Sequence, residues 1–212
     1  MEKRRTNAVF ITFEGIDGCG KSTQADLLVR RLKKETFGTR PILWTREPGG
    51  WEGGAWIRER ILKDRFLHPM SELFLFLVDR CEHVRREILP VLENGGIVVC
   101  ERYTDSTLAY QSWGRGIQPE RIESLFEWCA FPQPDLTFWL DLPVKEAMER
   151  VASRGGRDRF ESEGYAFLEK VRTGFSSLAA REPERILRAE ASEEAQALSS
   201  KLFSLLEVSR SR

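Results

Sequence analysis

The segment with the clearest capacity for chemistry is a short glycine-rich stretch near the N-terminus. Gly15-Ile16-Asp17-Gly18-Cys19-Gly20-Lys21-Ser22 fits the pattern G-x-x-x-x-G-K-[ST] in full. The glycines allow backbone N–H groups to wrap around a phosphate, and the helix that follows adds partial positive charge at its N-terminus. We expect Lys21 to reach the β- and γ-phosphates and the Ser22 hydroxyl to hold Mg²⁺. The stretch predicts binding of a nucleoside triphosphate and leaves open what happens to the phosphate.

Three further segments place cations where they could meet that phosphate. The segment Thr45-Arg46-Glu47-Pro48-Gly49-Gly50 directly follows one apolar run, and Glu101-Arg102-Tyr103 ends another. In a parallel sheet, the carboxyl ends of strands face the ligand crevice, so both arginines are candidates for contact with a ligand. A Gly/Arg-rich loop, Arg154–Arg159, lies between two helical stretches. Cations on such a loop can close over transferring phosphates and neutralise charge in the transition state.

The elements that must position these residues alternate along the chain. Strands are expected at Val9–Phe13, Ile42–Thr45, Ile97–Cys100, Leu136–Leu140 and, briefly, Ile186–Leu187. Helices are expected at Lys21–Glu35, Trp56–Lys63, a long stretch from an N-cap at Ser71 to Asn94 with a bend at Pro90, Thr104–Trp113, Pro119–Trp128, Val144–Ser153, Tyr165–Glu182 and the tail. This alternation predicts an α/β fold in which helices cover both faces of a parallel sheet, as one domain over residues 1–212.

Composition excludes several classes of protein. The 212 residues carry 33 basic and 33 acidic side chains, so the chain lacks the overall positive charge of a typical duplex nucleic-acid binder. Arginine outnumbers lysine by 25 to 8, a bias that genome composition would also explain. The longest apolar run, Leu73–Val78, is far shorter than the ~20 residues of a membrane span. We expect a cytoplasmic protein that binds neither nucleic acid nor membrane, with reduced cysteines and no zinc site.

The motifs together resemble one family closely. The set FEGIDGCGKST, TREPGG, ERYTDSTLAYQ, GRGI, PDLTFWLDL and RGGRDRFE is similar to that of bacterial thymidylate kinase, in the same order and from Phe10 to about Phe175. The resemblance implies the P-loop nucleoside monophosphate kinase fold, with a five-stranded parallel sheet flanked by helices and a lid loop at about 154–162. It also implies conversion of dTMP to dTDP with ATP and Mg²⁺ by an ATP:dTMP phosphotransferase, and a homodimer.

The same resemblance implies a role for individual residues. Phe76 would stack on thymine, Arg80 would reach a base carbonyl, Thr107 and Gln111 would contact the base edge, and Tyr110 would pack against the sugar. The residues implied for ATP are Gly15, Ile16, Asp17, Gly18, Cys19, Gly20, Lys21, Ser22 and Thr23. Those implied for dTMP are Asp17, through the 3′-hydroxyl, Arg46 and Arg102, through the phosphate, Phe76, Arg80, Ser106, Thr107, Tyr110 and Gln111. From the residues alone, core packing is the default interpretation of Phe76, which stands among Leu73, Phe74, Leu75 and Leu77. For Asp17, a solvated loop acid is the less favoured alternative.

Catalysis would rest on Lys21, Arg102, Glu101 and the lid arginines. Some members of the family carry an arginine inside the phosphate loop, where this chain has Gly18, and the bacterial type supplies Arg154 and Arg159 from the lid instead. Arg157 stands at a variable position. Glu101 departs from the aspartate that is usual in the family. Its carboxylate would either orient Mg²⁺ through water or hold a phosphate-binding arginine.

Two other functions are compatible with a phosphate loop. One is a kinase for another (deoxy)nucleoside monophosphate or for a deoxynucleoside, and in the nucleoside case Arg46 and Arg102 would have no acceptor phosphate to bind. The other is a non-catalytic nucleotide-binding switch. The absence of an N-K-x-D motif after the third or fourth predicted strand argues against a GTPase-type switch.

Overall fold

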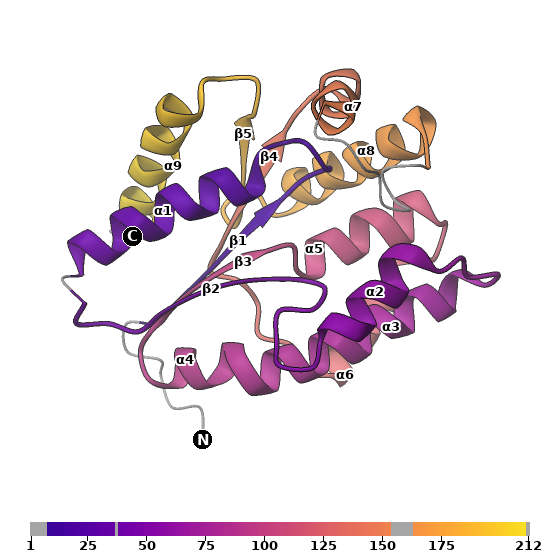
Figure 1. Cartoon of the computed structure of the whole chain (residues 1–212), viewed down its shortest axis with the longest axis horizontal. Helices are drawn as coiled ribbons and strands as arrows, with labels where there is room; N and C mark the ends of the chain where they lie inside the picture. The colour runs from indigo at the N-terminus through magenta and orange to yellow at the C-terminus, as the bar shows by residue number, and fades with distance from the viewer. Residues whose placement is uncertain (1–7, 37, 154–162, 211–212) are drawn as a thin grey trace.

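A parallel five-stranded sheet forms the centre of the molecule in the computed structural model, which describes residues 8–36, 38–153 and 163–210. The strand order is β2-β3-β1-β4-β5, so the strand before the phosphate loop is central (Figure 1). The strands are β1 (Val9–Glu14), β2 (Ile42–Arg46), β3 (Ile97–Glu101), β4 (Leu136–Asp141) and β5 (Ile186–Glu190). The predicted fold class is confirmed, and each expected strand lies within an observed one.

Helices connect the strands and cover the sheet. α1 and α9 lie side by side along it, and α2 lies beside α3 (Figure 1). The helical elements are α1 (Lys21–Glu35), α2 (Ala55–Lys63), α3 (Pro69–His83), η1 (Val84–Ile88), α4 (Leu89–Glu93), α5 (Thr104–Thr107), η2 (Leu108–Gly114), α6 (Pro119–Trp128), α7 (Val144–Ala152), α8 (Tyr165–Arg181) and α9 (Ala195–Arg210).

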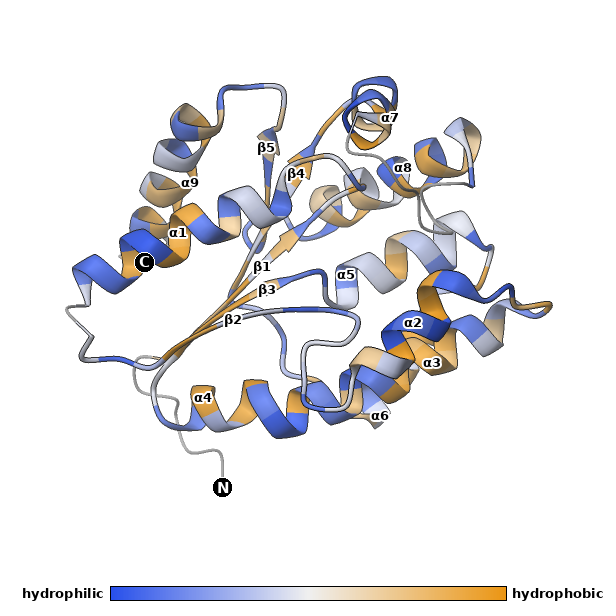
Figure 2. Cartoon of the chain, viewed as in Figure 1, coloured by the Kyte–Doolittle hydropathy of each residue, from blue (hydrophilic) through white to orange (hydrophobic). Residues whose placement is uncertain are grey.

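Alternating residues of the central strand build the core on both sides. Ile11 and Phe13 belong to the hydrophobic cluster that includes α1, whereas Phe10 packs in a cluster with Val84 and Ile88 of η1. Strand side chains point to opposite faces in turn, so a strand covered on both sides is mainly apolar on both faces. Figure 2 shows this hydrophobic centre, with hydrophilic stripes on the surrounding helices.

The long helical stretch before β3 begins earlier than the sequence predicted. Ser71 is not its N-cap: α3 starts at Pro69, and the side chain of His68 accepts a 3.1 Å hydrogen bond from the backbone N–H of Met70. Proline suits the first helical position because it lacks an N–H that would go unsatisfied there. The expected disturbance near Pro90 appears as the wide turn η1, just before α4. A proline cannot supply the N–H that a regular helix needs at that point.

The helix expected over Thr104–Trp113 is also irregular. It is α-helical only over α5 and then widens into the π-type turns of η2. Wide turns of this kind are frequent at functional sites. Among the described residues, no helix is long and apolar enough to cross a membrane.

Candidate active site

The phosphate loop connects the carboxyl end of β1 to the first turn of α1. Gly15 and Gly18 have positive φ values of 135° and 87°, and a Cβ at either would come within 2.6 Å of a backbone oxygen, that of Leu140 or Ala147 respectively. Only glycine fits such close approaches with left-handed backbone. Gly20, at the N-cap of α1, also has a positive φ. The loop therefore has the backbone conformation that the motif predicts.

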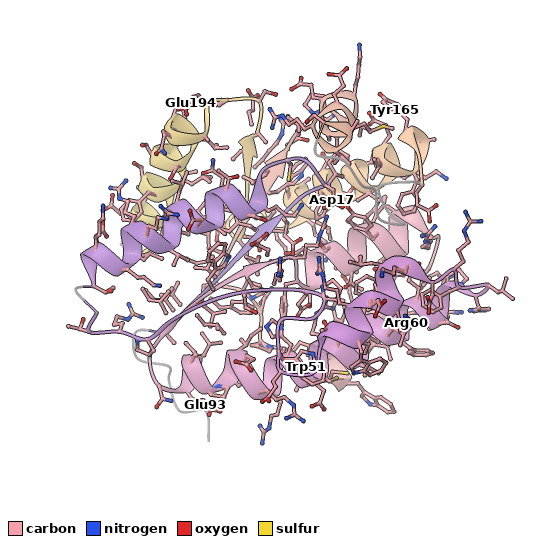
Figure 3. All side chains as sticks on the ribbon, in the orientation of Figure 1. Asp17, Trp51, Arg60, Glu93, Tyr165 and Glu194 are labelled. Carbon is pink, nitrogen blue, oxygen red and sulfur yellow. The ribbon has the colours of Figure 1, made fainter. Side chains whose placement is uncertain are left out.

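Two charged side chains of the loop face each other. The ammonium group of Lys21 donates to the carbonyls of Gly15 and Ile16, at 3.1 and 2.9 Å, and lies 3.7 Å from a carboxylate oxygen of Asp17. Asp17 also accepts a 2.7 Å bond from Nη2 of Arg102. Burial opposes ionisation of Asp17, but these two cations outweigh burial and lower its pKa to about 2. Asp17 is therefore a charged acceptor at the end of β1, where Figure 3 labels it.

Arg102 links the phosphate loop to the helix after β3. Its backbone is left-handed, with φ of 64°, a conformation that non-glycine residues adopt mostly where surrounding contacts impose it. Its guanidinium donates to Gly15 O at 3.0 Å, to Ser106 Oγ at 3.1 Å and to the Tyr110 hydroxyl at 3.2 Å, besides Asp17. These bonds fix the cation between the two halves of the site.

Buried Glu14 holds the turn in which Arg102 lies. Its carboxylate accepts from the backbone N–H of Tyr103 at 2.7 Å and from the hydroxyl of Ser106. Burial, followed by the nearby charge of Asp105, raises the pKa of Glu14 to about 7. Glu14 was not singled out from the sequence, although it stands at the end of β1 immediately before the phosphate loop.

A hydroxyl and a carboxylate lie together beside the loop. Ser22 donates a 2.5 Å bond to Oε2 of Glu101, whose Oε1 accepts from the indole of Trp44. Mg²⁺ in nucleotide sites is commonly held by one or two protein oxygens plus substrate phosphates. Ser22 and Glu101 offer hard oxygen donors of this kind, and the described residues contain no cluster of three or more His, Cys, Asp or Glu side chains that could hold a metal alone.

One pocket surrounds the phosphate loop and gathers cations at the strand ends. The parallel register places Arg46 opposite Glu101, and both residues line this pocket. Arg58 of α2 also lines it, with Nη1 donating to the carbonyl of Pro48 at 2.7 Å. Arg58 was not singled out from the sequence, because it stands inside a helix and not at the end of a strand. The lining residues are Asp17, Gly18, Gly20, Lys21, Ser22, Thr23, Arg46, Glu47, Arg58, Glu101 and Arg102.

A second, more apolar pocket adjoins the first and shares Asp17, Glu47, Arg58 and Arg102 with it. Every residue that the sequence analysis assigned to dTMP lines it, except Arg46. These are Asp17, Phe76, Arg80, Arg102, Ser106, Thr107, Tyr110 and Gln111.

Arg80 is the most buried cation in this second pocket. It is 1% exposed and pairs with Glu47, Nε to Oε2 at 2.7 Å. Its Nη2 donates to the carbonyl of Tyr103 and to the hydroxyl of Thr107, at 3.0 and 2.8 Å. Within the described structure, its buried Nη1 has no hydrogen-bond partner. Since a buried unpaired donor is costly, this nitrogen marks a place for an acceptor from a ligand.

Glu47 supports Arg80 from behind. Its second oxygen lies 2.9 Å from Nδ1 of His83, whose Nε2 lies 2.7 Å from the hydroxyl of Thr45. Burial raises the pKa of Glu47, but the charge of Arg80 and the contacts with His83 more than offset burial, and the net shift is downward. The Thr45–Glu47 segment thus braces the guanidinium from the end of β2. The expected lid residues Arg154, Arg157 and Arg159 lie outside the described residues.

Comparisons with known proteins agree on one family. The family model described as thymidylate kinase matches residues 13–202. A thymidylate kinase of Synechococcus sp. (strain JA-2-3B'a(2-13)) is 44% identical over 94% of each chain. A thymidylate kinase of Pseudomonas fluorescens (strain SBW25) is 43% identical over 95% of this chain and 98% of its own. The crystal structure of thymidylate kinase from Ehrlichia chaffeensis superposes with a TM-score of 0.77 at 33% identity, covering 95% of this chain and 99% of its own.

Proposed function

The chain belongs to the thymidylate kinase family, and we propose that it transfers the γ-phosphoryl group of ATP to the 5′-phosphate of dTMP, forming dTDP. The observation that carries this proposal is the shared wall of the two pockets. Asp17 and Arg102 line both the loop that suits a triphosphate and the apolar cavity that suits a base. An acceptor phosphate at that wall would lie next to the donor phosphates.

ATP would bind with its phosphates on the loop from Gly15 to Thr23. Lys21 would exchange its bonds to the loop carbonyls for the β- and γ-phosphates, which carry far more negative charge. Ser22 and Glu101 would hold Mg²⁺, directly or through water. The bound ion supplies charge neutralisation of the phosphates and orientation of the γ-phosphoryl group.

The acceptor phosphate would be held in line by Arg46 and Arg102. Arg58, at the boundary of the two pockets, would add a third cation. A phosphate monoester is largely ionised near pH 7, since its second pKa is about 6, so it needs little help from a base. Catalysis would then rest on positioning and on charge stabilisation by Lys21, Arg102 and the lid residues Arg154 and Arg159.

The nucleoside would occupy the second pocket. Phe76 would stack on the thymine ring, and the unpartnered nitrogen of Arg80 would bind a base carbonyl. Thr107 and Gln111 would face the base edge, with Tyr110 and Ser106 near the sugar. The carboxylate of Asp17 would accept from the deoxyribose 3′-hydroxyl, in competition with its present bond to Arg102.

An ADP-release assay tests the acceptor. The purified chain is given ATP and Mg²⁺ with dTMP, dUMP, dCMP, dGMP or thymidine, and we expect dTMP to give the highest kcat/KM. A higher kcat/KM with another monophosphate would identify a different base as the preferred acceptor. A higher kcat/KM with thymidine would contradict the proposed binding of an acceptor phosphate by Arg46 and Arg102. Slow ATP hydrolysis with no transfer to any acceptor would favour a nucleotide-dependent switch.

We also propose that two chains form a homodimer through α2 and α3. Large apolar side chains are exposed on these neighbouring helices: Trp56 is 58%, Phe74 50% and Val78 51% exposed. Large apolar side chains that gather on exposed faces are typical of protein interfaces. Light scattering should give the dimer mass for the wild type and the monomer mass for Phe74→Asp. A monomeric wild type would contradict the proposal.

A further inference from the structure

A buried carboxylate behind the base pocket controls the orientation of a pocket amide. Glu72 of α3 is 2% exposed, and its Oε1 accepts a 2.8 Å hydrogen bond from Nε2 of Gln111 in η2. A carboxylate has no proton to donate, so it must face the NH₂ end of the amide. The amide oxygen of Gln111 is thereby left to the pocket that this residue lines.

The same pocket presents a donor from another element. Nη1 of Arg80 is buried without a partner in the described structure, while its other nitrogens are used by Glu47, Tyr103 and Thr107. Because guanidinium groups can only donate, the pocket offers one donor from Arg80 and one acceptor from Gln111. Hydrogen bonds to other residues of the protein hold both groups in place.

The donor of Arg80 and the acceptor of Gln111 complement the hydrogen-bonding edge of thymine and not that of cytosine. Thymine has an acceptor at O4 next to a donor at N3, which complements Arg80 and Gln111. Cytosine has a donor at N4 next to an acceptor at N3, so both contacts would be mismatched. If the Gln111 amide turned over, its NH₂ would suit N3 of cytosine and repel the N3–H of thymine.

We infer that Glu72 is a positioning residue that sets thymine selectivity by holding the Gln111 amide with its oxygen toward the base. The inference rests on the proposed function. It adds a residue that does not line the base pocket and that acts only through Gln111.

Glu72 is itself held by Arg115, which lies four residues beyond Gln111. Nε and Nη2 of Arg115 donate to the two carboxylate oxygens of Glu72, at 3.2 and 3.3 Å. Nη2 also donates to Glu163 at 2.5 Å, and the guanidinium lies 4.6 Å from the ring centroid of Phe167. A forked contact of this kind fixes the plane of the carboxylate as well as its place. The orientation of Gln111 is thus fixed by Glu72 of α3, by Arg115 just after η2, and by Glu163 and Phe167 at the N-terminal side of α8.

The Glu72→Gln variant tests the inference, because its amide can either donate to or accept from Gln111. We expect the KM for dTMP to rise about tenfold or more, the loss that follows when a buried polar contact goes unsatisfied. The KM for ATP should stay within about twofold. The ratio of kcat/KM for dTMP to that for dCMP should narrow about tenfold. Glu82→Gln is the matched control, since Glu82 is also a carboxylate of α3 paired with an arginine, but at the surface.

A double-mutant cycle separates positioning from a purely structural role. Gln111→Leu should also narrow the preference for dTMP over dCMP, and adding Glu72→Gln to it should change the preference no further. Glu72→Asp keeps a group that only accepts and should retain most of the preference. This second set decides the question even if Glu72→Gln does not fold.

Two results would overturn the inference. One is a Glu72→Gln enzyme that loses kcat/KM for dTMP and dCMP by the same factor. The other is additive effects of the two substitutions on base preference. Failure of the proposed function is recognised separately, because the wild type in the same assay would then not phosphorylate dTMP.

Discussion

The indole N–H of Trp44 donates a 3.1 Å hydrogen bond to Oε1 of Glu101. Trp44 lies on the edge strand β2, where it is 44% exposed, and the pairing of β2 with β3 brings it alongside. The other oxygen of Glu101 accepts from Ser22. One glutamate carboxylate therefore meets both partners, a side chain from the phosphate-loop helix and one from the sheet edge.

We predict that Trp44→Phe lowers the apparent affinity of the enzyme for Mg²⁺. Without the indole bond, Glu101 loses one of its two fixed contacts, so the Mg²⁺ concentration at half-maximal rate should rise about three- to tenfold, in line with the loss of one hydrogen bond to a charged group. Calorimetry of ADP binding with and without Mg²⁺ provides a readout independent of turnover. In a Glu101→Asp background, Trp44→Phe should have little effect, because the shorter side chain cannot keep both contacts. Equal effects in both backgrounds would contradict this role for Trp44.

The features that could be predicted from the sequence are those that depend on residues close together along the chain. Glycine spacing identified the phosphate loop, and helical periodicity over a few turns identified the helices Lys21–Glu35 and Pro119–Trp128. Both helices have the predicted bounds in the structure. The arginines at strand ends were predicted because parallel strands end on the same side of a sheet.

Residues that act across elements could not be found in this way. Glu72 and Gln111 are 39 positions apart, and Trp44 and Glu101 are 57 apart. Nothing in the sequence near Glu72 distinguishes it from a solvated helical glutamate, and its burial follows only from how α3 packs. The wide turns of η2 also have no local sequence signal. The cap at His68, in contrast, is a local contact with Met70, and Pro69 was the sequence signal that could have found it.

Lys21→Ala should lower kcat by about 100-fold or more, the usual cost of removing one donor from developing charge. Lys21 is the only ammonium lining the loop pocket among the described residues. Steady-state assays with dTMP measure the effect, and circular dichroism verifies folding. Lys33→Ala, in the last turn of the same helix, is the control and should keep wild-type rates. Near-normal transfer by a folded Lys21→Ala enzyme would exclude the proposed mechanism.

Phe76→Ala should raise the KM for dTMP about ten- to hundredfold and leave the KM for ATP nearly unchanged. Phe76 lines the nucleoside pocket and not the phosphate-loop pocket, so its loss removes stacking from one substrate only. Leu67→Ala removes a fully exposed apolar side chain and should alter neither constant. Parallel increases in both KM values for Phe76→Ala would indicate a general loss of structure.

The last prediction concerns stability against pH and centres on Glu14. Burial and the charge of Asp105 raise its pKa from 4.5 to about 7, although Ser106, Arg102 and the N–H of Tyr103 pull it down. Between these values the folded chain holds a proton that the unfolded chain has released. Protonation of Glu14 therefore stabilises the fold, fully below about pH 4.5, and this contribution is lost as the pH rises through about 7.

Urea denaturation of the wild type and of Glu14→Gln at pH 5, 6, 7 and 8 measures this contribution. The variant cannot titrate at this site, so the free energy of unfolding of the wild type, minus that of the variant, should fall as pH rises from 5 to 7, by at most about 1.4 kcal/mol per pH unit for one proton. The difference should then level off above pH 7. Glu190→Gln, at the exposed end of β5, should give a difference that does not vary over this range. If the wild-type and Glu14→Gln curves run parallel from pH 5 to 8, Glu14 releases its proton at the same pH in the folded and unfolded chains, and the turn that carries Arg102 is held by a permanently charged carboxylate.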